Sequence, residues 1–250
     1  MPKARRHALV AATALLALLG SASPAPATAA VLAPIAAHHH GDGLLHGTSS
    51  NWGGYVATGG KFTSVSADWI QPAVTCTDSD TRSAFWVGLD GDGSNTVEQI
   101  GTEADCSSGS PVYSAWYEMF PSYPTDLRDP VEPGDHLTAS VTTDGSGTFT
   151  LALTDSTRGW SRSVRKTLKN AARASAEVIV EAPSSLFGVL PLAAFHTVGF
   201  TDATVNGQSL GAAKASSIDM AEGGVTKATT TALAGGTDFS VNWQHNWQHN

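Results

Sequence analysis

The chain has 250 residues, a formal net charge of -8 from 14 basic and 22 acidic side chains, and only two cysteines. An acidic protein repels nucleic acids and anionic membranes, so neither is expected as a partner. Two cysteines cannot form a structural zinc site by themselves, and we predict no metal ion and no other cofactor.

Residues 1–30 have the organisation of a secretory signal peptide. Lys3, Arg5 and Arg6 precede the apolar run ALVAATALLALLG, and the small residues of APATAA offer cleavage sites. This run is shorter than the roughly 20 residues of a membrane-spanning helix, and no later apolar run approaches that length. The sequence therefore predicts a soluble, secreted, monomeric product that is more acidic than the whole chain.

The remaining part of the chain is long enough for one domain with a sizeable core. Residues 31–48 have no sustained period and contain a His cluster, so we expect a leader or short propeptide. Residues 49–243 form the predicted domain. Residues 244–250, within the duplicated unit of NWQHNWQHN, form a predicted tail. In an oxidising compartment, Cys76 and Cys106 are expected to pair as a disulfide bond.

From Asn51 onward, short β-branched and aromatic runs alternate with turn-forming residues, which is typical of β-strands. The clearest runs are FTSVSADWI, SAFWVGL, VYSAWYEMF, HLTASVTT, TFTLALTD, AEVIVEA and FHTVGFTDATV. Only residues 161–175 could pass for a helix, and they lack a continuous apolar stripe. Many strands with regular turn signals predict an all-β fold, an antiparallel β-sandwich of the jelly-roll kind.

Alternation along a strand assigns side chains to its two faces. The residues that share a face are Glu177, Ile179 and Glu181 in AEVIVEA, Trp116 and Glu118 in VYSAWYEMF, and Trp86 and Asp90 in SAFWVGLD. Each of these three strands places a large aromatic or apolar residue beside a carboxylate. This composition suits the concave side of a sheet that binds a polymer. It fits equally well a core that contains the tryptophans and a rim that contains the acids.

Several catalytic sites are poorly supported by the sequence. No G-x-S-x-G motif is present, and only His136 and His196 fall within the β-rich region before the tail, so a serine or cysteine triad is not indicated. The run DGDGSN resembles the start of an EF-hand loop. It lacks the Gly and the Glu that a calcium loop needs at its sixth and twelfth positions, so it is interpreted as a tight turn.

Two carbohydrate-directed functions remain open at this point. Glu118 and Glu181 could serve as the acid and the nucleophile of a retaining glycosidase, which needs two carboxyl groups about 5 Å apart. Alternatively, Trp52, Trp86 and Trp116 could stack on sugar rings in a noncatalytic carbohydrate-binding module.

Five motifs occur in a defined order: SNWGGYV, FWVGLDGDGSNTVEQIGTE, YSAWYEMFP, PGD, and SAEVIVEAP followed by FHTVGFTDATVNG. In order and spacing they resemble the glutamic peptidases of family G1, the eqolisins, in the form found in actinobacteria. The resemblance covers about residues 50–207. It implies a sandwich of two curved antiparallel sheets and a secreted endopeptidase that cleaves protein or peptide substrates in acid.

The same resemblance assigns roles to individual residues. It implies a catalytic dyad of Gln99, in VEQIG, and Glu181, in AEVIVEAP. The residues that it implies for substrate binding are Trp52, Gly54, Trp86, Asp90, Trp116, Tyr117 and Glu118.

A carboxamide and a carboxylate can together hydrolyse an amide. The reaction needs an activated water, a donor for the developing oxyanion and a proton for the leaving nitrogen. Ionised Glu181 could move the protons, while the Gln99 amide, neutral at every pH, offers two N–H donors and one acceptor. Activity in acid would then require Glu181 to stay ionised, so we expect hydrogen-bond donors around it. Asp90 and Glu118 could instead raise the pKa of Glu181 by repulsion, and the sequence leaves this balance open. Alternation places the adjacent Glu98 on the opposite face from Gln99.

Overall fold

The computed structural model describes residues 46–77, 80–185 and 188–244. They belong to one compact unit, residues 31–250. The described residues form strands and turns and no helix, which confirms the predicted all-β class. The predicted signal peptide, most of the leader and nearly all of the tail lie outside the described residues.

Eighteen strands are described. In chain order they are β1 (His46–Ser49), β2 (Trp52–Ala57), β3 (Ser64–Ile70), β4 (Ala84–Leu89), β5 (Val97–Ser107), β6 (Ser110–Phe120), β7 (Thr125–Asp126), β8 (His136–Thr143), β9 (Thr148–Asp155), β10 (Trp160–Thr167), β11 (Ala176–Glu181), β12 (Ser184–Ser185), β13 (Gly188–Val189), β14 (Thr197–Val205), β15 (Gln208–Ser209), β16 (Ser216–Glu222), β17 (Val225–Thr230) and β18 (Phe239–Trp243).

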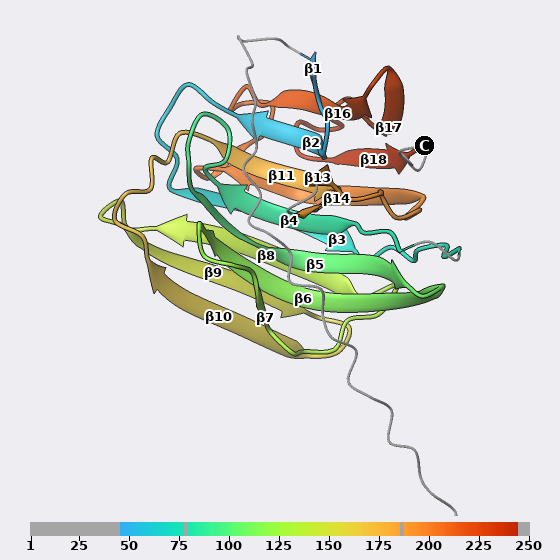
Figure 1. Cartoon of the computed structure of the whole chain (residues 1–250). Helices are drawn as coiled ribbons and strands as arrows, with labels where there is room; N and C mark the ends of the chain where they lie inside the picture. The colour runs from blue at the N-terminus through green and yellow to red at the C-terminus, as the bar shows by residue number, and fades with distance from the viewer. Residues whose placement is uncertain (1–45, 78–79, 186–187, 245–250) are drawn as a thin grey trace, which may run out of the picture. The chain divides into compact units, whose positions relative to one another are not determined.

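The strands form two packed layers (Figure 1). The front layer has the order β16-β2-β11-β4-β5-β6-β7, and the back layer has the order β10-β9-β8-β3-β14-β18. β17 pairs with β16 and with β18, so hydrogen bonding continues from one layer into the other. All these pairs are antiparallel, while β1 joins β16 in parallel. The predicted antiparallel sandwich is thus confirmed, with the addition that its two layers share a connecting strand.

The main core lies between the layers and follows the predicted alternation. Phe85 and Val87 of β4 point into this core, as do Val178 and Val180 of β11, and all four side chains are fully buried. The back layer contributes alternate residues of its own strands, including Leu151 of β9. Full burial of such a side chain contributes about 1.5–3 kcal/mol, so the two inner faces hold the layers together.

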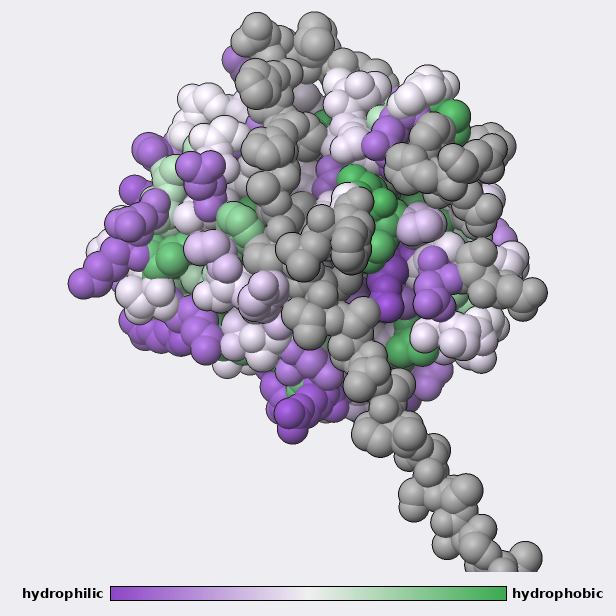
Figure 2. Space-filling view, viewed as in Figure 1, coloured by the Kyte–Doolittle hydropathy of each residue, from purple (hydrophilic) through white to green (hydrophobic). Residues whose placement is uncertain are grey.

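Two segments differ from their predicted boundaries or type. β10 occupies much of the stretch in which a helix was considered, and it pairs with β9 along its whole length. Its side chains are largely exposed, and hydrophilic residues predominate over the lower part of the view in Figure 2, where β9 and β10 lie. β1 begins inside the predicted leader 31–48, while β18 ends at Trp243, the last residue of the predicted domain.

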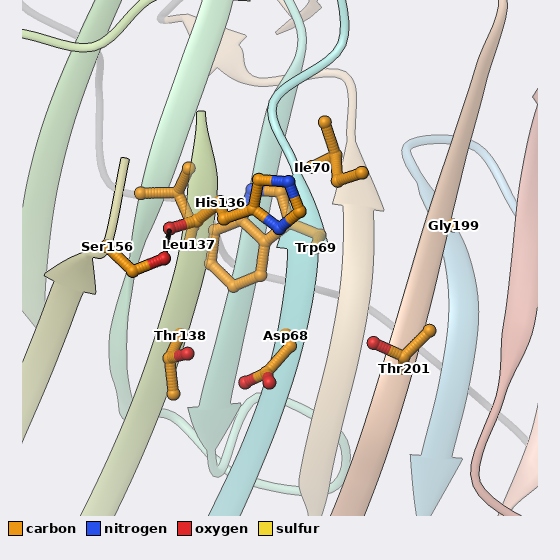
Figure 3. Close-up of a pocket in the computed structure, with 9 residues that line it drawn as sticks. All are labelled: Asp68, Trp69, Ile70, His136, Leu137, Thr138, Ser156, Gly199 and Thr201. Atoms are coloured by element: carbon orange, nitrogen blue, oxygen red, sulfur yellow. Dashed lines mark hydrogen bonds between the residues drawn. The ribbon is translucent and has the colours of Figure 1, made fainter. Parts of the chain in front are cut away.

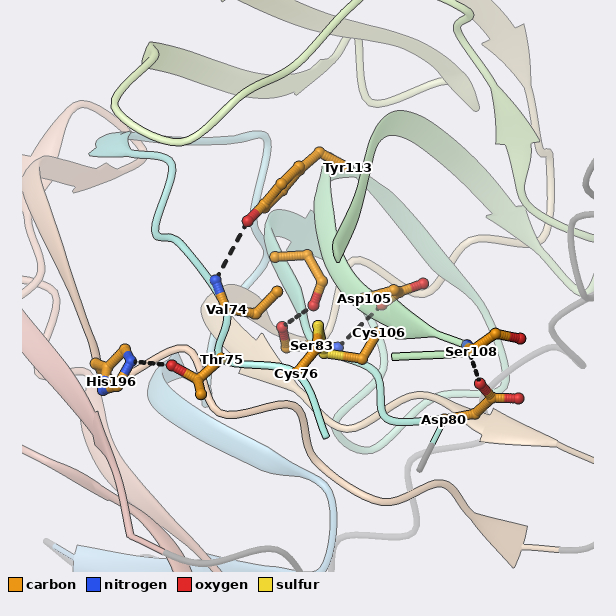
Figure 4. The surroundings of a disulfide bond; sticks show 11 residues. Val74, Thr75, Cys76, Asp80, Ser83, Asp105, Cys106, Ser108, Tyr113 and His196 are labelled. Atoms are coloured by element: carbon orange, nitrogen blue, oxygen red, sulfur yellow. Dashed lines mark hydrogen bonds between the residues drawn. A yellow bond between two sulfur atoms is a disulfide. The ribbon is translucent and has the colours of Figure 1, made fainter. Parts of the chain in front are cut away.

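The predicted disulfide bond between Cys76 and Cys106 is present (Figure 4). The two Cα atoms lie 5.4 Å apart, and the bond joins the segment after β3 to the end of β5. Nearby, the Tyr113 hydroxyl accepts a hydrogen bond of 3.3 Å from the Val74 main-chain N–H. The disulfide therefore connects a long irregular segment to the strand that carries Gln99.

Replacing both cysteines, as Cys76→Ser with Cys106→Ser, should lower the free energy of unfolding by about 3–4 kcal/mol. The bond closes a chain separation of 30 residues, and its loss releases the entropy of that loop in the unfolded state. Urea unfolding followed by tryptophan fluorescence measures this difference. The wild-type protein under reducing conditions is the control and should show the same loss, whereas an unchanged midpoint in both samples would contradict the prediction.

Candidate active site

A second cluster covers the outer face of the front layer, on the side opposite the main core. We call it the aromatic face; its residues are Trp52, Val56, Ala84, Trp86, Trp116, Ile179 and Ile218. Alternation left open whether Trp86 and Trp116 lie in the core, and the structure places both on the face opposite the main core. The face arises because β4 and β11 carry apolar or aromatic residues on both sides.

Strand register gathers carboxyl and amide groups into a first rank on this face. Gln99 of β5 pairs with Glu118 of β6 on one side and with Gly88 of β4 on the other, and Gly88 pairs with Glu177 of β11. Directly paired residues point to the same side of a sheet. The first rank therefore presents Glu177, Gln99 and Glu118, with the small Gly88 between the first two.

A second rank lies four residues further along β11. Glu181 pairs with Trp52 of β2 and with Ala84 of β4, and Ala84 pairs with Glu103 of β5. Both predicted catalytic residues thus lie on one face. They are in different ranks, with Trp86 between them along β4.

Glycines make room for the Trp86 indole between the two ranks. A Cβ atom added at Gly88 would lie 2.8 Å from Cζ3 of Trp86, and one added at Gly101 would lie 2.6 Å from Cβ of Trp86. A larger residue at Gly88 would displace the ring, and one at Gly101 would collide with the backbone of β4 at Phe85 and Trp86. The indole packs edge-on against Trp52, with ring centroids 5.1 Å apart.

Three N–H groups bind the fully buried Glu181 carboxyl. Oε1 accepts from Nδ2 of Asn51 at 2.9 Å and from Nε1 of Trp52 at 3.0 Å, while Oε2 accepts from Nε1 of Trp86 at 2.9 Å. Both lone pairs of Oε1 are used in this arrangement, and Oε2 keeps one. The carboxyl therefore has a fixed orientation and one remaining position for a proton or a ligand.

Burial raises the pKa of Glu181 to about 8. The Trp52 indole opposes this shift, repulsion from Glu118 adds to it, and the N–H groups of Trp86 and Asn51 also oppose it. The donors expected around Glu181 are present, but burial outweighs them. The sequence left open whether donors would lower this pKa or repulsion from Asp90 and Glu118 would raise it, and the structure favours the raised pKa, with Glu118 contributing.

Gln99 and Glu118 form a buried pair in adjacent strands. Nε2 of Gln99 donates to Oε2 of Glu118 at 2.6 Å. Burial raises the pKa of Glu118 to about 7, and the Gln99 N–H opposes this shift. Oε1 of Gln99, Oε1 of Glu118 and Nε1 of Trp116 have no hydrogen-bond partner within the part of the chain that the structure describes. Buried polar atoms are normally paired, so these three are suited to bind a ligand.

Asp90 has a different environment from the other predicted substrate-binding residues. It adopts a left-handed backbone conformation with φ of 68°. Its carboxylate accepts from the main-chain N–H groups of Arg173 and Ala174 at 2.6 and 2.7 Å, and from the Thr96 hydroxyl at 3.2 Å. Asp90 thus fixes the loop after β4 to the segment that leads into β11.

Packing contacts determine the positions of two further predicted substrate-binding residues, Tyr117 and Gly54. Tyr117 packs against the main core, on the opposite face from Trp116, and the Lys166 ammonium lies 5.4 Å from the centre of its ring. Gly54 has a φ of 142°, and a Cβ there would collide with the Val178 carbonyl oxygen. The structure brings Trp52, Trp86, Trp116 and Glu118 together with the dyad, and it does not bring the Tyr117 side chain there.

Sequence reasoning assigned no role to Asn51, Glu103 or Glu177, all of which lie at this site. Burial and the neighbouring Asp105 raise the pKa of Glu103, while Arg82, which forms a 2.6 Å ion pair with Asp105, opposes this. The rank position of Glu103 beside Ala84 could have been found only with strand register. Asn51 precedes β2, so alternation makes no statement about its direction.

A separate hollow lies on the outer face of the back layer (Figure 3). Its lining residues are Asp68, Trp69, Ile70, His136, Leu137, Thr138, Ser156, Gly199 and Thr201. It includes no member of either rank. Among the described residues, no group of three or more His, Cys, Asp or Glu side chains is placed to hold a metal ion.

Residues 50–243 match the family described as the peptidase A4 family. The chain belongs to this family. It is 28% identical over 215 residues to Aspergillopepsin-2 of Aspergillus niger, covering 75% of each chain. It is 32% identical over 170 residues to Scytalidopepsin B of Scytalidium lignicola, covering 62% of this chain and 63% of that protein.

Solved structures of glutamic peptidases have the same fold. Scytalido-glutamic peptidase with a transition state analog inhibitor gives a TM-score of 0.69 at 27% identity, covering 78% of this chain and 98% of that chain. Aspergilloglutamic peptidase from Aspergillus niger gives 0.59 at 26% identity, covering 66% and 99%. This peptidase A4 protein is therefore a glutamic peptidase, a peptide-bond hydrolase that acts on proteins or peptides. Family membership decides against the glycosidase and the carbohydrate-binding module.

The buried carboxyls make stability depend on pH in a defined direction. Folding raises the pKa of Glu118 to about 7, of Glu181 to about 8 and of Glu98 to about 9, in each case chiefly through burial. The native state then holds protons that the unfolded state releases, so stability is fully present below about pH 4.5 and is lost as pH rises through 7 to 9. Urea midpoints at about pH 4, 7 and 9 should decrease in that order.

Glu98→Gln is the matched variant for this prediction, since Glu98 points away from the aromatic face and forms no part of either rank. It should weaken the pH dependence and stabilise the protein at about pH 9 relative to wild type. A urea midpoint that rises from acid to alkaline pH in the wild-type protein would contradict the prediction.

Proposed function

We propose that this glutamic peptidase is a secreted endopeptidase that acts in acid through Gln99, Glu181 and an activated water. The observation that carries the proposal is the buried, three-donor site of Glu181 on the same face as Gln99, whose buried Oε1 has no hydrogen-bond partner among the described residues. Secretion is supported by the signal-like start of the sequence and by the disulfide bond. No helix among the described residues is long and apolar enough to cross a membrane.

Glu181 is favoured over Glu177 as the partner of Gln99, although Glu177 shares the first rank. The donors on Glu181 fix its orientation, and its interaction with Glu118 places it near the carboxyl that Gln99 binds. Burial raises the pKa of Glu177 well above the usual range, and the Ser175 side chain opposes this shift. Neither carboxyl oxygen of Glu177 meets the geometric criteria for a hydrogen bond within the described residues, so Glu177 lacks the three N–H donors that orient Glu181.

Glu181 starts the reaction as an acid. Because Oε1 already accepts two N–H groups, the proton of the neutral carboxyl resides on Oε2. This O–H donates to the carbonyl oxygen of the scissile bond. Gln99 Oε1 accepts a hydrogen bond from the attacking water, and the Nε2 hydrogen not bound to Glu118 donates to the substrate oxygen.

Proton transfer then proceeds through one carboxyl group. As water adds to the carbonyl carbon, the Glu181 proton passes to the carbonyl oxygen, and the resulting carboxylate takes a proton from the added water. Glu181 next protonates the amide nitrogen, the C–N bond breaks and the amine leaves. The extra proton of the new carboxylic acid returns to Glu181, so the enzyme ends in its starting state.

Gln99→Ala should lower kcat by roughly 100-fold or more while KM changes little, because the amide acts mainly on the developing oxyanion and the attacking water. Glu181→Gln should abolish turnover, since the variant keeps the shape but has no exchangeable acid proton. Casein hydrolysis at about pH 4 measures both effects, with circular dichroism to establish folding.

Glu177→Gln is the matched control for these two variants, and it should retain activity. If the folded Glu181→Gln variant cleaved casein at the wild-type rate while Glu177→Gln did not, Glu177 would be the partner of Gln99 and the proposed dyad would be wrong.

Glu118→Gln should move the alkaline limb of the kcat/KM profile to lower pH. The Glu118 carboxylate raises the pKa of Glu181 by repulsion, so its removal lets Glu181 lose its proton earlier as pH rises. The Gln side chain can still accept from Gln99, which preserves the pair. Asp68→Asn, in the back layer, is the control and should leave the limb in place; a shift to higher pH in Glu118→Gln would reject this electrostatic link.

A further inference from the structure

One donor to Glu181 comes from a residue outside the regular strands. Asn51 lies between β1 and β2 and is 6% exposed. Its Nδ2 donates to Oε1 of Glu181 at 2.9 Å, and its main-chain carbonyl accepts from the Ala182 N–H at 2.8 Å. A single residue therefore contacts both the Glu181 carboxyl and the backbone just after it.

Ser49 sets which way the Asn51 amide points. Its hydroxyl donates to Oδ1 of Asn51 at 3.1 Å, and its oxygen accepts from the main-chain N–H groups of Asn51 and Trp52 at 3.2 and 3.0 Å. With Oδ1 bound to a donor, Nδ2 is the atom that faces Glu181. The same hydroxyl fixes the start of β2, from which the Trp52 indole reaches Oε1.

A buried ammonium group contacts the segment between β1 and β2 from the other side. Lys227 of β17 is 1% exposed, and its Nζ donates to the Ser50 carbonyl at 2.9 Å and to Oε2 of Glu222 at 2.6 Å. β1 adds to the edge of β16 through parallel pairing that ends at Ser49 and Met220. Residues 49–52, which we call the positioning bend, are thus fixed by β11, β16 and β17.

We propose that Asn51 is a positioning residue of the catalytic site, oriented by Ser49, and that it holds Glu181 so that Oε2 is the oxygen that exchanges protons with the substrate. The inference rests on the proposed Gln99 and Glu181 dyad and adds a second part to it. Together with the Trp52 N–H, the Asn51 N–H occupies Oε1 and leaves the single remaining lone pair on Oε2. Without Asn51, either oxygen can carry the proton, and only one of them is correctly placed.

Asn51→Ala, made in the secreted protein, should lower kcat at least about 10-fold with KM within about 3-fold, because a positioning group acts in the reaction step more than in binding. It should also shift the alkaline limb of the kcat/KM profile to higher pH, since the lost N–H stabilised the Glu181 carboxylate. A merely structural role would not produce this shift. Thr48→Ala is the matched control, because its exposed side chain lies in the same segment.

Asn51→Asp tests the same contact in a different way. In acid the neutral Asp side chain can donate its O–H to Glu181 and should restore much of the activity that Asn51→Ala lacks. As pH rises, the ionised Asp can no longer donate an O–H to Oε1 of Glu181, so the orienting contact is lost and this variant should lose activity at lower pH than wild type.

The outcomes separate the inference from the function on which it rests. If Gln99→Ala and Glu181→Gln are inactive but a folded Asn51→Ala enzyme keeps the wild-type kcat and pH profile, the positioning role is wrong and the dyad stands. Equal inactivity of Asn51→Ala and Asn51→Asp at about pH 4, with both folded, would also overturn it. If Gln99→Ala and Glu181→Gln remain active, the proposed function is wrong, and the positioning role that rests on it is wrong too. Ser49→Ala combined with Asn51→Ala should lower kcat by less than the product of the two single effects, since part of the effect of Ser49 passes through Asn51.

Discussion

The fully buried Glu181 carboxyl, with its three N–H donors, is the interaction on which the front layer depends. The donors come from the positioning bend, from β2 and from β4, while the acceptor is in β11. Leaving a buried carboxyl unpaired costs several kcal/mol, so these three neighbouring segments are fixed relative to one another. The small residues at Gly88 and Gly101 are needed because Trp86 must reach this carboxyl from between the two ranks.

Burial of so many acidic groups explains how one face can serve both folding and chemistry. A carboxyl that keeps its proton costs little to bury, and in acid Glu118 and Glu181 are both neutral. The outer face of the back layer has a different composition. There β3, β8 and β9 expose mainly Ser and Thr, whose side chains stay uncharged at all these pH values. The two outer faces therefore differ in how strongly their charge depends on pH.

Much of the fold and site could be predicted from the sequence because β-strands alternate strictly. Alternation correctly grouped Trp116 with Glu118, and Trp86 with Asp90, on one face of their strands, but it left open whether the tryptophans lie in the core. It also separated Tyr117 from Trp116, and in the structure Tyr117 packs against the main core instead of taking the lining role implied by resemblance. The pairing register of the strands could not be predicted, because no local sequence pattern reveals that Glu103 shares a rank with Glu181. Asn51 lies outside any strand, where periodicity gives no direction.

The parallel contact between β1 and β16 has a consequence for how the enzyme is made. The positioning bend takes its final place only when β16 and β17 are available, because β1 pairs with β16 and Lys227 holds the Ser50 carbonyl. Those strands are among the last parts of the domain to leave the ribosome. A growing chain that already carries Gln99 and Glu181 therefore still lacks the bend, and under the proposed mechanism catalytic competence arises only when synthesis of the domain is nearly finished.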